Sequence, residues 1–372
     1  MNKLAIIEPS KTGAEHLSFN SSIIRELIRS YSLDNISLFC SRSHFDALAQ
    51  PKTPFRSLPV VSIVLRRFVL KALVEGAAIL LAFTRLRSAG IRHAIVLSVF
   101  PPLLNWLGFV STLFGVHTTI ILHGELEGLV DQSRQRVTSY GFWVKRFFER
   151  DGFKVMKCIV LSEGIMQRLT KIYPTCTSFI VWANHPIAQA SHVSENRDIT
   201  FATVGVATEK KHLVLFETMS KLAAAGYFCA HVGMTEEYLF KRYSKSIKFL
   251  CEPGSHLSVK EFDLALRRVS NAIFPYSPNS YQMTVSGAML DAIGSGCHVI
   301  SLPNTCAEDM RRSGLPVTIA ESVEDLFATN TLLPPQSPCW DQFSAREFCL
   351  TLLIGSGLMP MRTEGIKPTG IQ

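Results

Sequence analysis

Short apolar runs alternate with longer amphipathic stretches along the first half of the chain. Six apolar runs predict β-strands: LAIIEP, ISLFCS, AIVLSVF, TTIILHGE, CIVLSE and SFIVWAN. Between them, stretches with helical spacing predict helices, among them FNSSIIRELIRSY, WVKRFFERDGFKVM and GIMQRLTKIY. Apolar strands that alternate with helices are typical of a parallel sheet covered on both faces, so we expect an α/β domain here.

The same alternation begins again after a polar stretch at residues 185–198, which we interpret as an interdomain linker. Its strands are predicted at ITFATVG, YFCAHVG, IKFLCE, NAIFPYS and CHVISLP, and its helices at HLVLFETMSKLAAAG and VKEFDLALRRVS. The predicted fold is therefore α/β with two doubly wound Rossmann-like domains, at residues 1–190 and 191–340. Residues 341–372 are expected to form a C-terminal helix, SAREFCLTLLIG, and a tail.

Two apolar segments raise the question of a membrane. Residues 94–122 contain no Lys, Arg, Asp or Glu, but Pro101, Pro102 and Gly115 divide them, which predicts strand, helix and strand rather than a membrane span. In residues 60–87 the apolar positions are interrupted by basic ones. That pattern suits a helix on an anionic surface, and it equally suits an amphipathic helix packed on the sheet.

Charge is unevenly distributed between the two halves. Residues 1–190 hold 22 Lys and Arg against 12 Asp and Glu, a net charge of +10, so the remainder carries −2 of the total of +8. This asymmetry predicts an anionic partner for the first half, either a membrane surface or a phosphate-bearing substrate; a plain basic surface is the alternative. The nine Cys are scattered without a CxxC motif, as in a reduced cytoplasmic protein, and the N-terminus suggests a first strand rather than a signal peptide.

The stretch TVSGAMLDAIGSGCHVIS, residues 284–301, has an unusual composition for a core helix. Ser286 is placed to cap a helix whose first turn contains Gly287, where free backbone N–H groups and the missing side chain would admit an anion. Asp291 lies one turn further on the same face, within reach of a ribose diol. A capped core helix with a solvated carboxylate is the alternative interpretation.

Within this stretch, SGAMLDAIGSGCHVI resembles the nucleotide-sugar motif of GT-B glycosyltransferases, especially the glycogen-synthase-like (group 1) branch that includes bacterial polysaccharide enzymes. The resemblance implies two Rossmann-like domains facing across a cleft, with the donor bound by the C-terminal one and Asp291 in the place of the ribose-binding glutamate. Two positions depart from that pattern, since Met283 and Val206 replace the family's second glutamate and its loop arginine. The stereochemistry is therefore left open.

Further donor-binding residues follow from the resemblance. In VGVATEKKH, Lys210 or Lys211 follows Gly205 and is expected to meet the donor diphosphate as a point charge. In FPYSPNSYQMTVSG, Tyr276 and Tyr281 are candidates for contacts to the donor phosphate or sugar, although loop tyrosines also simply pack.

Candidate catalytic groups lie in two loops of the first domain. His123, in ILHGELEG, follows a central strand, where catalytic groups collect. The family resemblance implies that it faces the donor sugar or pyrophosphate; a buried structural histidine is the alternative. Glu15 and His16 follow the first strand, and either is a candidate general base for the acceptor hydroxyl. The sequence has no GxGxxG, Walker A or DxD motif, which argues against a P-loop NTPase and a metal-dependent GT-A enzyme.

We therefore predict a metal-independent hexosyltransferase that needs no cofactor beyond its nucleotide-diphospho-sugar donor and binds no nucleic acid. By resemblance, its acceptor would be lipid-linked and its role would be bacterial surface or exopolysaccharide synthesis. The protein would then lie on the cytoplasmic face of the cell membrane as a peripheral protein. A nucleotide-sugar epimerase and a non-catalytic partner in a membrane assembly are the alternatives. The sequence leaves the sugar, base, acceptor and oligomeric state open.

Overall fold

The structure is a computed structural model, and it describes residues 3–13, 15–31, 35–48, 54–59, 68–130, 137–188, 197–328 and 340–358; the side chains of Tyr31 and Lys211 are outside the description. The chain divides into two compact units. Unit 1 combines residues 1–186 with residues 342–372, and unit 2 comprises residues 187–341. The predicted C-terminal helix thus packs as part of unit 1. Most of the predicted linker, residues 189–196, lies outside the described residues.

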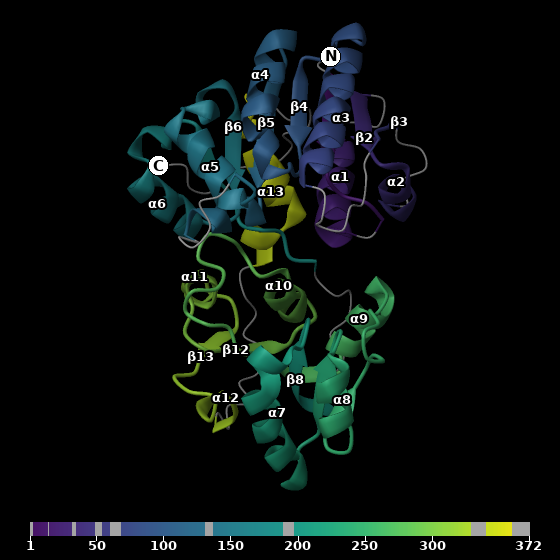
Figure 1. The fold of residues 1–372 in the computed structure, drawn as a ribbon, viewed down its shortest axis with the longest axis vertical. Coiled ribbons are helices and arrows are strands. Elements are labelled where there is room, and N and C mark those ends of the chain that lie inside the picture. The colour runs from purple at the N-terminus through teal and green to yellow at the C-terminus, as the bar shows by residue number, and fades with distance from the viewer. Residues whose placement is uncertain are drawn as a thin grey trace. The chain divides into compact units, whose positions relative to one another are not determined.

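The described residues of unit 1 form a parallel sheet in the order β3-β2-β1-β4-β5-β6-β7 (Figure 1). Its strands are β1 (Leu4–Glu8), β2 (Ile36–Cys40), β3 (Phe55–Ser57), β4 (His93–Val96), β5 (His117–Leu122), β6 (Lys157–Val160) and β7 (Ile180–Trp182). All five residues of the central strand β1 are buried. This matches the expectation for a strand covered on both faces, and it includes one carboxylate, Glu8.

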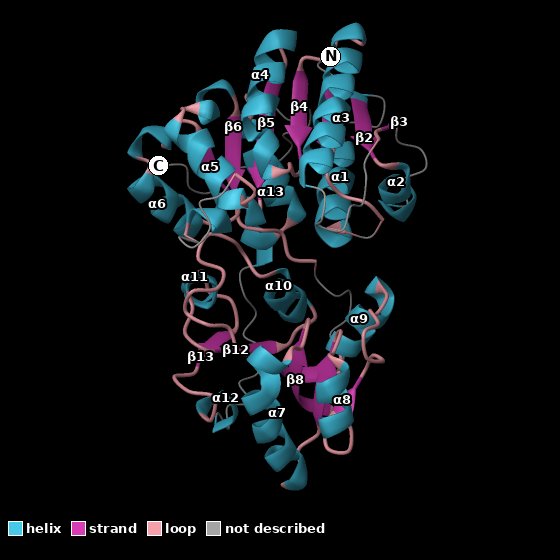
Figure 2. Ribbon diagram, in the orientation of Figure 1, coloured by secondary structure: helices cyan, strands magenta, loops and turns pink. Residues whose placement is uncertain are grey.

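Helices cover both faces of this sheet. They are α1 (Leu17–Tyr31), α2 (Arg42–Leu48), α3 (Phe68–Ser88), α4 (Leu104–Phe114), α5 (Tyr140–Glu149), α6 (Glu163–Ile172) and α13 (Ala345–Gly355). In Figure 2, α3, α4 and α5 lie side by side over one face. Helix α13 packs against α1, which belongs to the other face because right-handed crossovers put α1 and α4 on opposite sides.

Two sequence expectations in unit 1 are settled by these elements. Residues 94–122 form β4, α4 and β5, with Gly115 in the left-handed conformation at the end of α4, so the predicted strand, helix and strand are confirmed. The single helix predicted over 143–156 is wrong. Helix α5 ends at Glu149, Asp151 is left-handed, and a 3-10 turn, η4 (Gly152–Val155), follows. The left-handed Asp151 interrupts the helical backbone, and Gly152 lets the chain pack closely against Phe147, where a side chain would have no room.

The described residues of unit 2 form a second parallel sheet, in the order β10-β9-β8-β11-β12-β13. Its strands are β8 (Ile199–Val204), β9 (Cys229–Val232), β10 (Lys248–Phe249), β11 (Val269–Phe274), β12 (His298–Ser301) and β13 (Val317–Ile319). Its helices are α7 (Glu209–Ala224), α8 (Glu237–Tyr243), α9 (Val259–Leu266), α10 (Gly287–Gly294), α11 (Thr305–Arg312) and α12 (Asp325–Ala328). Both units are therefore doubly wound, as predicted.

The strand order places one switch point in each unit, where neighbouring strands lead to helices on opposite faces. In unit 1 this point lies between β1 and β4, and in unit 2 it lies between β8 and β11. Ligands of doubly wound sheets bind beyond the carboxyl ends of the strands at such points. The predicted site residues Glu15 and His16 follow β1, Gly205 follows β8 and Tyr276 follows β11.

Candidate functional site

The first turn of α10 in unit 2 has the arrangement that the sequence predicts. Ser286 is fully buried, and its hydroxyl accepts a hydrogen bond from the backbone N–H of Met289 at 3.3 Å. Gly287, the first residue of the helix, is exposed, and a Cβ added to it would meet no atom within 4 Å. The backbone at Gly287 therefore opens to solvent at the positive end of the helix dipole.

Asp291 is also exposed, one turn further along α10. Desolvation by the surrounding protein, and then the negative charge of Asp263 on α9, raise the pKa of Asp291 to about 6. A carboxylate held beside another carboxylate gains from hydroxyl donors, which favour its ionised form. Asp291 is thus suited to a diol and unsuited to a phosphate.

Two tyrosines lie close to Ser286, the residue that caps α10. The Tyr276 hydroxyl and the Ser286 hydroxyl are 3.1 Å apart, so Tyr276 supports the capping residue. The ring of Tyr281 lies 4.6 Å from that of Tyr276, and Tyr281 has a left-handed backbone with φ of 57°. The structure therefore brings Tyr276, Tyr281 and Ser286 together beside Gly287.

The two glycines at the other end of α10 have different roles. Gly296 is left-handed with φ of 80°, as expected for a residue that ends a helix. Gly294 is the last helical residue, and a Cβ there would stand 2.4 Å from the carbonyl oxygen of Ala188. Gly294 therefore permits a close backbone approach, a reason that the sequence did not reveal.

The loop after β8 differs from its prediction. Gly205 is left-handed with φ of 105°, and the added Cβ of Gly233 would meet its carbonyl oxygen at 2.0 Å, so the loops after β8 and β9 are in close contact. Lys210 belongs to the exposed first turn of α7 rather than to the loop. Lys211 is in the same turn, and its side chain lies outside the described part of the chain.

Sequence reasoning missed Glu236 at this point. Its carboxylate accepts a hydrogen bond from the backbone N–H of Glu209 at 2.8 Å, and so it caps α7 from the neighbouring loop. The residue in the N-cap position, Thr208, makes no such bond. A diphosphate approaching the start of α7 would therefore meet Glu236 as well as Lys210. Glu236 precedes α8, and no local pattern ties it to α7.

In unit 1, the rings of His16, Phe19 and His185 surround His123. The His123 ring lies 4.4 Å from Phe19, 5.2 Å from His16 and 6.3 Å from His185, between ring centroids. His123 is only 6% exposed, and its ring hydrogen-bonds the backbone of Leu97. Its Nε2 atom is buried and has no hydrogen-bond partner among the residues that the structure describes. The predicted pair His16 and His123 is thus brought together.

Glu15, the other candidate base, is engaged in its own loop. Its carboxylate accepts a hydrogen bond from the backbone N–H of Thr12 at 3.1 Å, and its side chain is exposed. His16 has a left-handed backbone with φ of 53°, which is uncommon for a residue with a side chain. His16 therefore stands at the start of α1 in a conformation that the surrounding loop must hold.

The electrostatics of this group favour neutral histidines. Burial lowers the pKa of His123 well below its ordinary value, and the charges of His16 and His185 add to this effect. Desolvation and then the charge of Lys11 lower the pKa of His16 to about 4, although its ring remains exposed. Burial raises the pKa of Glu125, whose carboxylate accepts a hydrogen bond from the backbone N–H of His123 at 2.6 Å.

Sequence reasoning also missed Lys11. Its positive charge acts on His16, His123 and Glu125 from the loop after β1. The only signal in the sequence was its position between the first strand and the predicted base. Lys11 therefore places a positive charge beside the neutral histidines at this end of the sheet.

Two further observations bear on cofactors and membranes. Among the described residues, no three His, Cys, Asp or Glu side chains are grouped so that they could hold a metal ion. Within the same residues, every helix is too short or too polar to cross a bilayer.

The chain has the GT-B fold of two doubly wound units, as its similarity to solved structures shows. No protein-family model matches the sequence, and no curated protein is detectably similar to it. Among similar structures, sucrose-phosphate synthase from Thermosynechococcus elongatus has a TM-score of 0.60 and 13% identity, covering 95% of this chain and 98% of that chain. HepE from Anabaena, in complex with UDP and glucose, has a TM-score of 0.57 and 10% identity, covering 96% and 98%.

A third similar structure belongs to a protein named for a different activity. A putative UDP-N-acetylglucosamine 2-epimerase from Listeria monocytogenes has a TM-score of 0.58 and 8% identity, covering 94% of this chain and 96% of that chain. At identities this low, the similarity establishes the fold alone. Transferases and epimerases share this fold, so it does not decide between the two activities. The function must therefore be argued from the candidate donor-binding residues of unit 2 and the candidate catalytic residues of unit 1.

Proposed function

We propose that this protein is a glycosyltransferase that moves a sugar from a nucleotide-diphospho-sugar to an acceptor. The first turn of α10 carries the proposal. There, Gly287 is exposed and open, and Asp291 is exposed one turn away. A diphosphate on the N–H groups of that turn and a ribose diol on Asp291 would satisfy both features with one ligand.

The acceptor and its chemistry would belong to unit 1. Neutral His16 could take a proton from the acceptor hydroxyl, since a group with pKa of about 4 is unprotonated at neutral pH. Glu15 stays an alternative base, although its carboxylate already accepts from Thr12. By the family resemblance, His123 would serve the donor sugar or its pyrophosphate. Lys210 or Lys211 and the helix end would stabilise the departing diphosphate.

A lipid-linked acceptor is supported by the outer face of α3 and α4. Val69 and Leu73 of α3 are 69% and 67% exposed, and Phe109 and Leu113 of α4 are 56% and 61% exposed. The two helices contact each other, with the Trp106 side chain donating to the Gly76 carbonyl. Exposed apolar side chains on two contacting helices, with Arg85 and Arg87 in the last turn of α3, suit the surface of an anionic membrane.

That membrane proposal rests on exposed side chains of the described helix, since Arg66 and Arg67 lie outside the described residues. Leu73→Glu should reduce co-sedimentation with vesicles that contain phosphatidylglycerol. Leu264→Glu, at an exposed leucine of α9 in unit 2, is the matched control. Equal binding of the two variants would contradict this face. If vesicle binding is lost only at high salt, charge rather than the apolar face accounts for it.

The proposed donor binding by unit 2 is tested by measuring its melting midpoint with and without UDP, GDP, dTDP and CMP. A nucleotide at a hundred times its dissociation constant adds about 2.7 kcal/mol to the unit that binds it. The shift should be absent in Asp291→Ala and present in Glu321→Ala, which removes another exposed carboxylate of unit 2. A normal shift in Asp291→Ala would exclude the ribose role.

A nucleotide-sugar epimerase is the second candidate, and the Listeria structure is the observation that favours it. It predicts turnover of the donor alone, which a coupled assay with UDP-N-acetylglucosamine would detect. The non-catalytic alternative is favoured by Met283, which is buried where the resemblance expects a carboxylate, and by Val206. It predicts no nucleotide-dependent shift at all.

A further inference from the structure

The loop that follows β1 in unit 1 is held by side chains of β1, of α3 and of the start of α2. The backbone N–H of Ser10 donates to Glu8, and the Ser10 hydroxyl donates at 2.7 Å to Glu75, a buried carboxylate of α3. The carbonyl of Lys11 accepts from the hydroxyl of Ser41 at 3.1 Å. Loop backbones usually bond to water, so this loop is unusually constrained.

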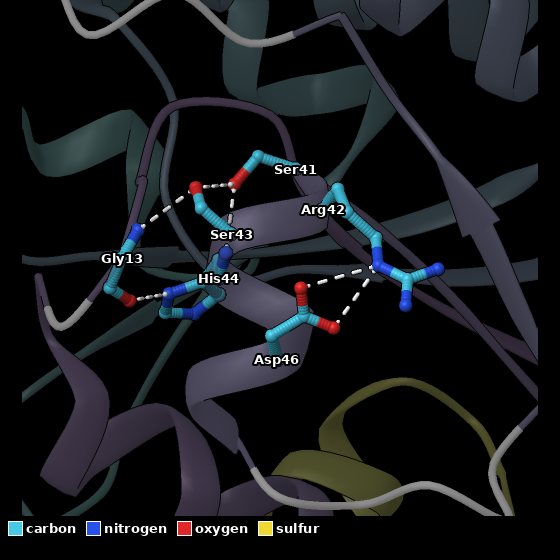
Figure 3. Close-up of polar contacts among 6 residues, drawn as sticks. All are labelled: Gly13, Ser41, Arg42, Ser43, His44 and Asp46. Carbon is cyan, nitrogen blue, oxygen red and sulfur yellow. Dashed lines mark hydrogen bonds and ion pairs between the residues drawn. The ribbon is translucent and has the colours of Figure 1, made fainter.

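The start of α2 contributes most of these contacts, and it is shown in Figure 3. The backbone N–H of Gly13 donates to the Ser43 hydroxyl at 3.2 Å, and the carbonyl of Gly13 lies 2.8 Å from Nδ1 of His44. Gly13 is left-handed, so both of its polar groups turn toward α2. Arg42, beside them, bonds only to Asp46 among these residues.

A buried chain of hydrogen bonds determines which ring nitrogen of His44 carries the proton. The amide nitrogen of Asn20 lies 3.2 Å from Glu8 and 3.0 Å from Nε2 of His44. Each of its two hydrogens thus has an acceptor, which makes Nε2 the acceptor and Nδ1 the donor to Gly13. Glu8 also accepts from the Ser98 hydroxyl after β4, so this chain of hydrogen bonds joins both strands of the switch point.

The charges around His44 agree with a neutral ring. Burial lowers its pKa, Lys11 lowers it further, and Glu15 and the bond to Gly13 act in the opposite sense. The same loop carries Lys11 and leads to His16, whose left-handed backbone needs support from its surroundings. In the described part of unit 1, Ser43 and His44 are the two side chains that hydrogen-bond to the Gly13 backbone.

We propose that Ser43, His44, Asn20 and Glu8 are positioning residues that hold the β1–α1 loop so that Lys11 and His16 face the acceptor. The inference rests on the proposed function for the meaning of that placement. They act through the loop and touch no substrate themselves. Relaxing the loop would move Lys11 away from His16 and expose the His16 ring further to water, and both changes raise the His16 pKa toward its ordinary value.

Ser43 offers the sharpest variant because its side chain is exposed and its removal leaves the core intact. In full-length protein with ¹⁵N-labelled histidine, Ser43→Ala should raise the titration midpoint of His16 by about 0.5 pH unit or more. Ser43→Thr keeps the hydroxyl and should keep the wild-type midpoint. Arg42→Ala, an exposed neighbour that does not reach Gly13, is the matched control. The groups facing His16 are Lys11, His44, His123 and His185.

Two results would overturn the proposal: a His16 midpoint that is the same in Ser43→Ala and Arg42→Ala, or a neutral His44 that carries its proton on Nε2. A role confined to stability would lower the melting midpoint without moving the His16 titration. The readout needs no donor. If UDP fails to stabilise the wild type, the donor proposal fails, while the histidine titration still decides whether the loop is held as proposed.

Discussion

Gly287→Ala separates the requirements of the fold from those of the ligand. The added Cβ meets no atom within 4 Å, and Gly287 is not left-handed, so unit 2 accommodates alanine without strain. Alanine favours a helix by up to about 1 kcal/mol over glycine. The melting midpoint of unit 2 should therefore stay unchanged or rise, by at most about 2–4 °C for a domain of this size.

The ligand should respond in the opposite sense. A Cβ at the first turn of α10 stands where a diphosphate would approach the backbone, so the stabilisation by UDP should be lost. For the wild type that stabilisation is about 2.7 kcal/mol at a hundredfold excess over the dissociation constant, or roughly 5–10 °C. Differential scanning fluorimetry with and without UDP measures both effects in one experiment.

Gly294→Ala is the matched control on the same helix. Its Cβ would meet the carbonyl of Ala188 at 2.4 Å, so this variant should lower the melting midpoint. Residual folded protein should still respond to UDP, because the first turn is untouched. The reasoning is refuted if Gly287→Ala destabilises unit 2 as strongly as Gly294→Ala does, or if Gly287→Ala keeps the full UDP shift.

The remaining predictions concern protons. Because the pKa of Asp291 is about 6 and a diol binds its ionised form, affinity for UDP-glucose should fall as the pH falls through 6. The loss at pH 5 should be at most about tenfold, since solvent screens an exposed carboxylate; calorimetry on Asp291→Asn should show no such pH dependence. Burial lowers the pKa of His123 well below its ordinary value, so its ¹⁵N signals should titrate at a lower pH than those of an ordinary histidine. A His123 that titrates near 6.5 would contradict the burial described for it.

Much of the fold could be predicted because its information is local. Each buried strand is a short apolar run, and residues 94–122 carry their own proline and glycine boundaries. The Ser286 cap and the Gly287 turn were equally readable, since a cap and the helix it begins are neighbours in sequence. Helix α13 could be predicted as a helix, but its packing on α1 depends on residues more than 300 positions away.

The parts of the sites that escaped prediction depend on contacts between distant segments. Glu236 caps a helix that begins 27 residues before it. Glu8 bonds to Ser98, 90 residues further along the chain. The contact of Gly294 with Ala188 spans more than a hundred residues. Spacing rules describe neighbours on one helix or strand, so they cannot anticipate these pairs.

The buried ring of His123 in unit 1 is relevant to the choice between an enzyme and a non-catalytic partner. A buried nitrogen without a hydrogen-bond partner costs about 1–3 kcal/mol, and His123 keeps such an atom. His16 adds a left-handed backbone beside it, another unfavourable feature of the isolated fold. A chain that only had to fold and bind a partner protein would gain stability by replacing both residues. A substrate that hydrogen-bonds to His123, and an acceptor that must reach the ring of His16, would give the chain a physical reason to keep both histidines. The proposed catalytic role would therefore account for both unfavourable features.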